Sequence, residues 1–327
     1  MMMNAARSLL AVVNSSSMRI VFMGTPESAV PSLRRLVDDG HEIAAVWTQP
    51  DKPAGRGKKL HASPVKDFAV ERGLSIHQPA KIKNDEAKRL FASHQADVAV
   101  VVAYGKILPA EFLAAPKLGC VNVHFSLLPK YRGAAPVNWA IVNGESESGV
   151  TTMQVVEELD AGPILLQEST AIGNDETAPQ LLARLAESGA ALISRTLQQI
   201  SELNPKAQAA EQATFAPILK REDGLIDWST DAFAIERRIR GFQPWPNAYT
   251  SLDARRITLW RAQAEPTISS SIKPGVVMES HGHNLIVHCG DQTALRILEL
   301  QAEGGRRMST RDFLNGAHIA AGNELGS

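Results

Sequence analysis

The sequence predicts an α/β protein with an N-terminal Rossmann-like domain built on a parallel sheet and a smaller C-terminal β-barrel, of the oligonucleotide-binding (OB-like) kind. From Arg19 to about residue 203, short β-branched apolar runs alternate with amphipathic stretches, as strands covered by helices on both faces require. Beyond residue 217, one helical pattern precedes five short strand-like runs separated by turn residues, which is typical of a small barrel.

The N-terminal domain is expected over residues 18–203. Apolar runs predict strands at 20–23, 43–47, 98–103, 121–124, 152–156 and 164–170. Amphipathic spacing predicts helices at 27–39, 64–72 and 85–93, the last with Asn84 as its N-cap, and a long helix that begins near Thr177. Residues 1–17 contain one short apolar run, too short for a membrane span. We expect this extension to be disordered or not translated.

The C-terminal domain is expected over residues 218–327. Residues 204–217 are polar and alanine-rich with a proline near each end, which predicts a linker. A helix is expected at 230–240, and the five strands near 248–252, 256–262, 275–278, 284–289 and 294–300.

Length and composition permit two domains, and the overall charge does not indicate a nucleic-acid partner. The chain has 327 residues, of which 44% are hydrophobic and 21% charged, so it can build sizeable cores. Its net charge is −1 at pH 7, and contact with nucleic acid must therefore depend on local basic clusters. Cys120 and Cys289 lie in apolar runs without a neighbouring pair of metal ligands. We interpret them as reduced core thiols and expect no metal.

One predicted strand ends in a polar pair. In "GCVNVHFSLLPKYRG", residues 119–133, Asn122 and His124 lie two positions apart and so share one face of the strand. They lie at its C-terminal end, where open α/β sheets bind ligands. The spacing fits equally a core histidine hydrogen-bonded by a neighbouring amide.

Asp160, in the tight segment 159–162, adds a carboxylate to this pair. A histidine can take the proton of an attacking amine, a carboxylate can orient the imidazole, and an amide can donate to a developing oxyanion. Because no serine or cysteine nucleophile is evident, the set favours direct acyl transfer to an amine through one tetrahedral intermediate. The hypothesis assumes that the three residues converge.

A second candidate segment is the loop "TQPDKPAGRGKKLHASPVK", residues 48–66. It holds the cations Lys52, Arg56, Lys58 and Lys59. A basic loop at the ligand edge of a sheet can bind phosphates or a nucleic-acid end, although a solvated surface loop has the same composition. The turn after the first strand holds only one glycine, Gly24, so a nicotinamide site is disfavoured.

At these residues the chain resembles the folate-dependent formyltransferases. The resemblance rests on Asn-x-His followed by Ser-Leu-Leu-Pro and an Arg-Gly turn, and on the later Leu-Asp-x-Gly, and it covers the chain from Met18 to about Gly322. It implies 10-formyltetrahydrofolate as formyl donor and Asn122, His124 and Asp160 as the catalytic set.

The resemblance also implies binding residues. It places the folate beside Ser126, Leu127, Leu128 and Pro129, with the pterin against the backbone of Val101, Ala103, Tyr104, Gly105 and Leu108. The loop with Lys52, Arg56, Lys58 and Lys59 is similar to the one through which some members engage the acceptor end of methionyl initiator tRNA. The C-terminal domain would also contact the tRNA.

Two alternatives remain open from the sequence. The same motifs fit enzymes that formylate a nucleotide-linked amino sugar, and only the basic loop favours tRNA. A non-catalytic RNA-binding protein could also use this scaffold. We expect a monomeric, cytoplasmic enzyme of translation initiation that does not associate with membranes.

Overall fold

The computed structural model describes residues 17–54, 59–266, 271–317 and 319–326, and Arg56 and Lys58 lie outside this part of the chain. The chain divides into two compact units. The first contains residues up to Val121 together with 193–203, and the second contains 122–192 and 204–327.

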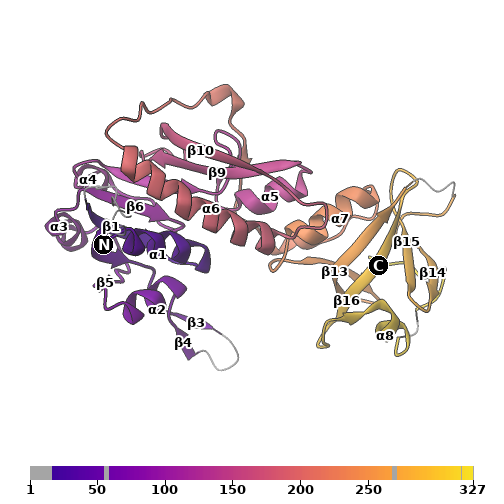
Figure 1. Ribbon diagram of the computed structural model, residues 1–327. Coiled ribbons are helices and arrows are strands. Elements are labelled where there is room, and N and C mark those ends of the chain that lie inside the picture. Colours follow the sequence, from indigo (N-terminus) through magenta and orange to yellow (C-terminus); the bar gives the residue numbers. More distant parts are fainter. Residues whose placement is uncertain (1–16, 55–58, 267–270, 318, 327) are drawn as a thin grey trace, which may run out of the picture. The chain divides into compact units, whose positions relative to one another are not determined.

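The first unit contains a parallel sheet, as predicted. Its strands are β1 (Arg19–Gly24), β2 (Glu42–Trp47), β5 (Ile76–His77) and β6 (Val98–Val102), in the order β6-β1-β2-β5 (Figure 1). β1 is paired in parallel with β2 and with β6, and its residues from Ile20 to Met23 are fully buried. Such a strand needs continuous apolar residues, because helices cover both faces of the sheet.

In the first unit, the described residues up to Val121 form the helices α1 (Val30–Asp38), α2 (Pro64–Glu71), α3 (Asp85–Ser93) and α4 (Ala110–Ala114). Two of these helices, α2 and α3, begin at a side-chain N-cap. Asn84 caps α3 by accepting a hydrogen bond from the amide of Ala87, which confirms that prediction. α1 begins three residues later than predicted, because Glu27–Ala29 form a 3-10 turn. β6 ends at Val102, since Ala103 adopts a φ of 47°.

β7 (Cys120–His124) begins in the first unit and ends in the second, where it precedes an antiparallel pair of strands, β9 (Glu147–Gln154) and β10 (Ile164–Ala171). The shorter elements are β8 (Arg132–Gly133), β11 (Phe215–Ala216), α5 (Pro136–Val142) and the 3-10 turn Ala210–Gln212, and the long helix is α6 (Ala178–Gln199). β9 starts earlier than predicted. Its first residues are polar or small, and a Cβ at Gly149 would lie 2.5 Å from Leu127.

Residues 204–217, expected as a linker, form hydrogen-bonded structure. We call them the connecting segment. Lys206 and Ile164 exchange two backbone hydrogen bonds of 2.8 Å, and β11 pairs in parallel with β8. The segment is therefore attached near both ends, to the start of β10 through Lys206 and to β8 through β11.

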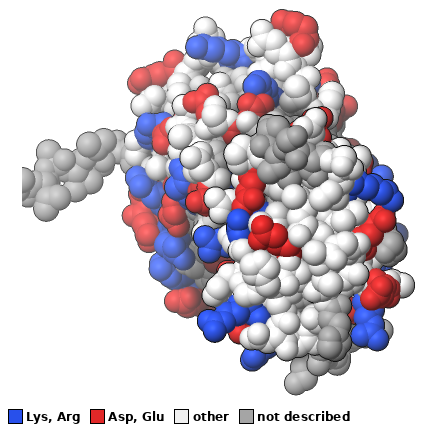
Figure 2. All heavy atoms as spheres, turned by 90° about the vertical axis from the view of Figure 1, so that its right-hand side faces the viewer, with Lys and Arg blue, Asp and Glu red and all other residues white. Residues whose placement is uncertain are grey.

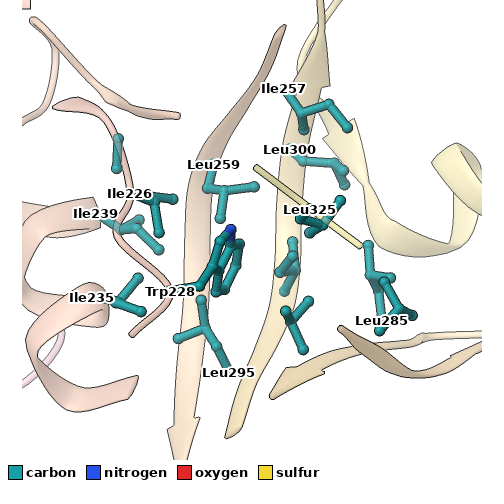
Figure 3. Packing of buried hydrophobic residues seen from close by; sticks show 14 of the residues in the cluster. Ile226, Trp228, Ile235, Ile239, Ile257, Leu259, Leu285, Leu295, Leu300 and Leu325 are labelled. Carbon is teal, nitrogen blue, oxygen red and sulfur yellow. The ribbon is translucent and has the colours of Figure 1, made fainter. Parts of the chain in front are cut away.

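The remaining residues build the predicted antiparallel sheet. After a 3-10 turn (Arg221–Gly224), its elements are α7 (Ala232–Gly241), β12 (Ala248–Leu252), β13 (Arg255–Glu265), β14 (Val277–His281), β15 (Asn284–His288), β16 (Ala294–Ala302), β17 (Met308–Ser309) and α8 (Thr310–Leu314). The strand order is β12-β13-β16-β15-β14, with β17 beside β16. Figure 3 shows Trp228 at the centre of the core, between Leu259 and Leu295. The Trp228 indole donates to Thr250 Oγ1 at 3.0 Å.

α7 joins this sheet to the preceding part of the second unit. Asn138 Nδ2 of α5 donates to the carbonyl of Gly241 at 2.7 Å, and Trp139 contacts Phe242 edge to face at 5.6 Å. A Cβ at Gly241 would lie 2.6 Å from Val142, so only glycine permits this approach. No helix in the described ranges has the length and apolar character needed to cross a membrane.

Candidate active site

β7 presents Asn122 and His124 on one face, as its alternation predicts. Val123 and Phe125 point the other way, toward α6, where a Cβ at Gly189 would lie 2.9 Å from Val123 and 3.5 Å from Phe125. Asn122 is half-buried and His124 is buried. The glycine in α6 thus lets the helix press the apolar side of β7 and leaves the other side to the two polar residues.

The His124 ring is held by a backbone carbonyl. Its Nε2 lies 2.9 Å from the carbonyl oxygen of Tyr131, which can only accept, so in the neutral ring Nε2 carries the proton. Nδ1 is then the acceptor, and it lies 3.7 Å from Asp160 Oδ2. The carboxylate thus faces the free nitrogen of the ring, while the Tyr131 carbonyl sets the orientation of the imidazole.

Asp160 lies in the turn between β9 and β10. Its φ of 51° is left-handed, a conformation that aspartate tolerates better than most residues. The amide of Gly133 donates to Asp160 Oδ2 at 2.9 Å. A Cβ at Gly162 would lie 1.8 Å from the carbonyl oxygen of Gln154, so the turn needs this glycine. The structure therefore brings Asp160 to His124, as the sequence hypothesis assumed.

Hydrogen bonds with Thr151 and Gln167 fix the segment Ser126–Pro129. Thr151 Oγ1 donates to the Ser126 carbonyl at 2.6 Å and accepts from the Leu128 amide at 3.2 Å. Gln167 Nε2 donates to the Leu128 carbonyl at 2.8 Å and to Thr151 Oγ1 at 2.9 Å. The peptide bond between Leu128 and Pro129 is cis. A segment held in this way offers a preformed edge to a ligand.

In the first unit, the residues implied for the pterin surround the end of β6. Val101, Tyr104 and Leu108 are buried, whereas Ala103 and Gly105 are exposed and have positive φ values of 47° and 78°. The Tyr104 hydroxyl is buried without a hydrogen-bond partner in the described part of the chain, and burial raises its pKa. The segment combines an apolar wall with exposed main chain, which suits a flat heterocycle with a polar edge.

A network of side chains ties down this segment. The Tyr104 carbonyl accepts hydrogen bonds from Thr25 Oγ1 at 3.3 Å and from Gln49 Nε2 at 2.9 Å. Gln49 is the second residue of the basic loop, so the start of that loop and the proposed pterin segment share one anchor.

The basic loop contains a short hairpin, β3 (Lys52–Ala54) and β4 (Lys59–His61) (Figure 1). Lys52 is exposed, and Lys59 lies at the start of β4. Beneath the hairpin, Asp51 binds Lys66 at 2.6 Å and Gln78 at 2.7 Å. Hydrogen bonds from Gln78 and Lys66 lower the pKa of Asp51, so its carboxyl group stays ionised. The ammonium group of Lys66 balances the charge of this carboxylate, the one acidic group of the loop.

Sequence reasoning missed Lys106, which lies among the residues implied for the pterin. Its ammonium donates to the carbonyls of Pro79 and Ala80 at 2.6 and 2.9 Å. Burial, and then the charge of Lys52, lower its pKa. Lys52 and Lys106 therefore act electrostatically on each other, which adds a cation to those of the basic loop.

A polar hollow of about 300 Å³ lies on the C-terminal sheet. Its lining residues are Arg221, Asn247, Arg256, Thr258, Trp260, Gln301, Ala302, Glu303 and Gly304. The Arg256 guanidinium stacks 3.8 Å from the centre of the Tyr249 ring. Its Nε and the Asn247 Oδ1 are buried without a partner in the described ranges. No motif in the sequence pointed to this hollow.

Neither the cysteines nor the potential metal-binding side chains of the described residues form a second candidate site. Cys120 and Cys289 are free and buried, as predicted, and burial raises the pKa of each thiol to about 12. The described residues contain no group of three or more histidine, cysteine, aspartate or glutamate side chains that could hold a metal ion.

Both parts of the chain match known protein families. The family model for formyl transferases matches residues 18–197, and the model for their C-terminal domain matches residues 218–318. A methionyl-tRNA formyltransferase of Caldanaerobacter subterraneus subsp. tengcongensis is 49% identical, covering 94% of this chain and 100% of that protein. The protein of the same name from Methylococcus capsulatus is 47% identical, covering 95% and 100%.

A solved structure shows the same fold at low identity. The N-formyltransferase from Helicobacter canadensis, in complex with folinic acid and dTDP-3-aminofucose, superposes with a TM-score of 0.66 at 18% identity. The match covers 86% of this chain and 98% of that one.

Proposed function

Because the chain belongs to the formyl transferase family, we propose that it catalyses the reaction for which its curated relatives are named. It transfers the formyl group of 10-formyltetrahydrofolate to the α-amino group of methionine esterified to initiator tRNA, for initiation of translation. The observation that carries this proposal is the 49% identity that extends over the whole length of a methionyl-tRNA formyltransferase. The contact between His124 and Asp160 supplies the chemistry.

Two groups of residues would bind the donor. 10-Formyltetrahydrofolate supplies a formyl group activated on nitrogen. Ser126, Leu127, Leu128 and Pro129 would border it in the second unit, on the edge that Thr151 and Gln167 fix. Val101, Ala103, Tyr104, Gly105 and Leu108 would hold the pterin in the first unit, with exposed main chain at Ala103 and Gly105.

The catalytic residues act in one transfer step. The neutral amino group of methionine attacks the formyl carbon, and His124 Nδ1 accepts the proton that the nitrogen loses, since Nε2 is engaged with Tyr131. Asp160 stabilises the imidazolium from 3.7 Å. The Asn122 amide donates to the formyl oxygen as it gains negative charge. The bond between the formyl carbon and the nitrogen of the donor then breaks, and that departing nitrogen takes the proton from His124. The imidazole thereby returns to its neutral state.

The tRNA would be bound through local cations. Figure 2 shows lysine and arginine interspersed with aspartate and glutamate on the face that it draws, in keeping with the net charge of −1. Lys52 and Lys59 of the hairpin, together with Arg56 and Lys58, would engage the acceptor end. Arg256 in the hollow of the C-terminal sheet offers a second contact for a phosphate.

A nucleotide-linked amino sugar is the second candidate acceptor. The Helicobacter canadensis protein, solved in complex with dTDP-3-aminofucose, has the same fold, and at 18% identity the likeness concerns the fold alone. An assay with labelled 10-formyl donor separates the two acceptors. We expect label in methionyl initiator tRNA and none in dTDP-linked amino sugar, whereas the opposite distribution would overturn the proposed acceptor.

The remaining properties follow from this function. We propose a monomeric enzyme of the cytoplasm that needs no metal and does not associate with membranes, and the two buried free thiols suit a reducing compartment. The functional division is a catalytic domain at 18–203, the connecting segment, and a tRNA-contacting domain at 218–327.

A further inference from the structure

The connecting segment contains a side chain that reaches the catalytic turn. Gln208 Nε2 donates to two backbone carbonyls, that of Asp160 at 2.9 Å and that of Gly162 at 2.7 Å. Its Oε1 accepts a hydrogen bond from Arg132 Nε at 3.0 Å. Nε2 also lies 3.9 Å from Met153 Sδ. Both hydrogens of the amide and its oxygen are thus engaged, and two of the partners are carbonyls of the turn that presents Asp160.

These bonds complete a closed ring of contacts around Asp160. Its carboxylate accepts from the amide of Gly133, and its carbonyl accepts from Gln208. Arg132, the residue before Gly133, donates to Gln208. The side chain and the main chain of Asp160 are therefore fixed by groups that also fix each other.

The turn needs this support for two reasons. The left-handed φ of Asp160 is unfavourable for a residue with a Cβ unless neighbouring contacts hold it. Arg132 is 5% exposed, and it also contacts Glu158, a largely exposed side chain, at 3.3 Å. Gln208 is the neutral group that satisfies both the buried guanidinium and the two carbonyls.

The ends of the connecting segment keep Gln208 in place. On one side, Lys206 pairs with Ile164. On the other side, the carbonyl of Ala216 accepts from the amides of Ala134 and Ala135 at 2.9 and 3.3 Å. A Cβ at Gly133 would lie 2.5 Å from that carbonyl oxygen. The segment is thus packed against the residue that donates to Asp160.

We propose that Gln208 is a positioning residue for Asp160: it holds the carboxylate where it can stabilise protonated His124. This inference rests on the proposed formyl transfer and concerns a residue outside the proposed catalytic set. Gln208 acts only through Asp160. Its replacement should therefore change kcat and leave the KM values unchanged, and only while the Asp160 carboxylate is present.

The test uses the full-length enzyme and the variant Gln208→Glu. Glutamate has the same shape and still accepts from Arg132, but it cannot donate to the carbonyls of Asp160 and Gly162. We expect kcat to fall about 10- to 100-fold, as small displacements of catalytic groups do, with the KM values for methionyl-tRNA and donor within twofold of wild type. If this variant does not fold, Gln208→Met, uncharged and of similar length, is expected to show the same loss.

Gln243 provides a matched control. Its Nε2 donates to the carbonyls of Ile239 and Trp260, both at 2.9 Å, so Gln243→Glu makes the same chemical change in the C-terminal domain. We expect that change to lower the melting temperature and leave kcat within twofold of wild type.

A double variant separates positioning from general stability. The double variant Asp160→Asn, Gln208→Glu is expected to have a kcat within twofold of that of Asp160→Asn alone, because the carboxylate that Gln208 positions is gone. An undiminished loss in that background, or wild-type kcat in folded Gln208→Glu, would refute the inference. Absence of formyl transfer by the wild-type enzyme would instead contradict the proposed function.

Discussion

Thr151→Val tests whether the edge formed by Ser126–Pro129 is preformed. Valine has the shape of threonine but cannot form the hydrogen bonds of Thr151 Oγ1 to Ser126, Leu128 and Gln167. Thr151 is fully buried, and Ser126 and Leu128 are 1% and 3% exposed. Water therefore cannot replace the lost bonds to the Ser126 carbonyl and the Leu128 amide.

The expected loss of stability follows from these two groups. Each buried polar group left without a partner costs about 1–3 kcal/mol, so the free energy of unfolding should fall by about 2–6 kcal/mol. Gln167 retains its bond to the Leu128 carbonyl and adds little. The donor should also bind more weakly, and a loss of about 1 kcal/mol in binding corresponds to a roughly fivefold higher Kd.

Urea denaturation and a titration with the folate donor measure both effects. Thr250→Val is the control, because Thr250 is 1% exposed and its Oγ1 accepts from Trp228 in a core without a predicted folate contact. It should cost about 1–3 kcal/mol and leave the Kd for the donor unchanged. The reasoning fails if Thr151→Val is no less stable than Thr250→Val and binds the donor as tightly as the wild type.

Three further predictions concern catalysis, pH and tRNA. His124→Gln should lower kcat about 10²- to 10⁴-fold, because Nδ1 is the proton acceptor; a folded variant with wild-type turnover would exclude this role. Burial lowers the pKa values of His77 and His94, and the charges of His77 and Arg19 lower that of His94 further. The unfolded chain thus binds more protons, and the stability due to these residues is complete above about pH 6.5 and is lost as pH falls toward the depressed folded values. The midpoint of urea unfolding should be lower at pH 5.5 than at pH 7.5, and an unchanged pH dependence in His94→Gln would contradict this origin. Lys52→Ala and Arg256→Ala should each raise the KM for methionyl-tRNA about 3- to 10-fold, reduce its salt dependence by about one unit of slope and leave the KM for the donor unchanged. Lys117→Ala, which removes a cation paired with Asp97, is the control, and an equal effect of this variant would show that the response is not specific.

Sequence patterns predicted the parts of the site that depend on local periodicity. Alternation along β7 placed Asn122 and His124 on one face and Val123 on the other, because strand geometry fixes the direction of successive side chains. The terminal residues of a strand were less predictable. β6 ends at Val102 because Ala103 turns to a positive φ, and alanine carries no signal for that conformation.

The contacts that complete the site could not be read from the sequence. His124 is oriented by the carbonyl of Tyr131, and every residue has a carbonyl. Gln208 lies in a polar, alanine-rich stretch with the composition of a linker, and only the fold shows that its amide reaches Asp160. Thr151 looks like an ordinary strand residue until its three partners are known. Such contacts join residues distant in the chain, and no local pattern encodes them.

The connecting segment also sets an order of events during synthesis on the ribosome. The chain emerges from its N-terminus, so His124 and Asp160 are free to fold well before Gln208 and Ala216 appear. The bonds that Gln208 and Ala216 make to the catalytic turn and to the residues around Gly133 form only afterwards. A nascent chain that ends at residue 203 contains Asn122, His124 and Asp160 but lacks these bonds, so the proposed support of Asp160 forms only when the last part of the segment has been synthesised.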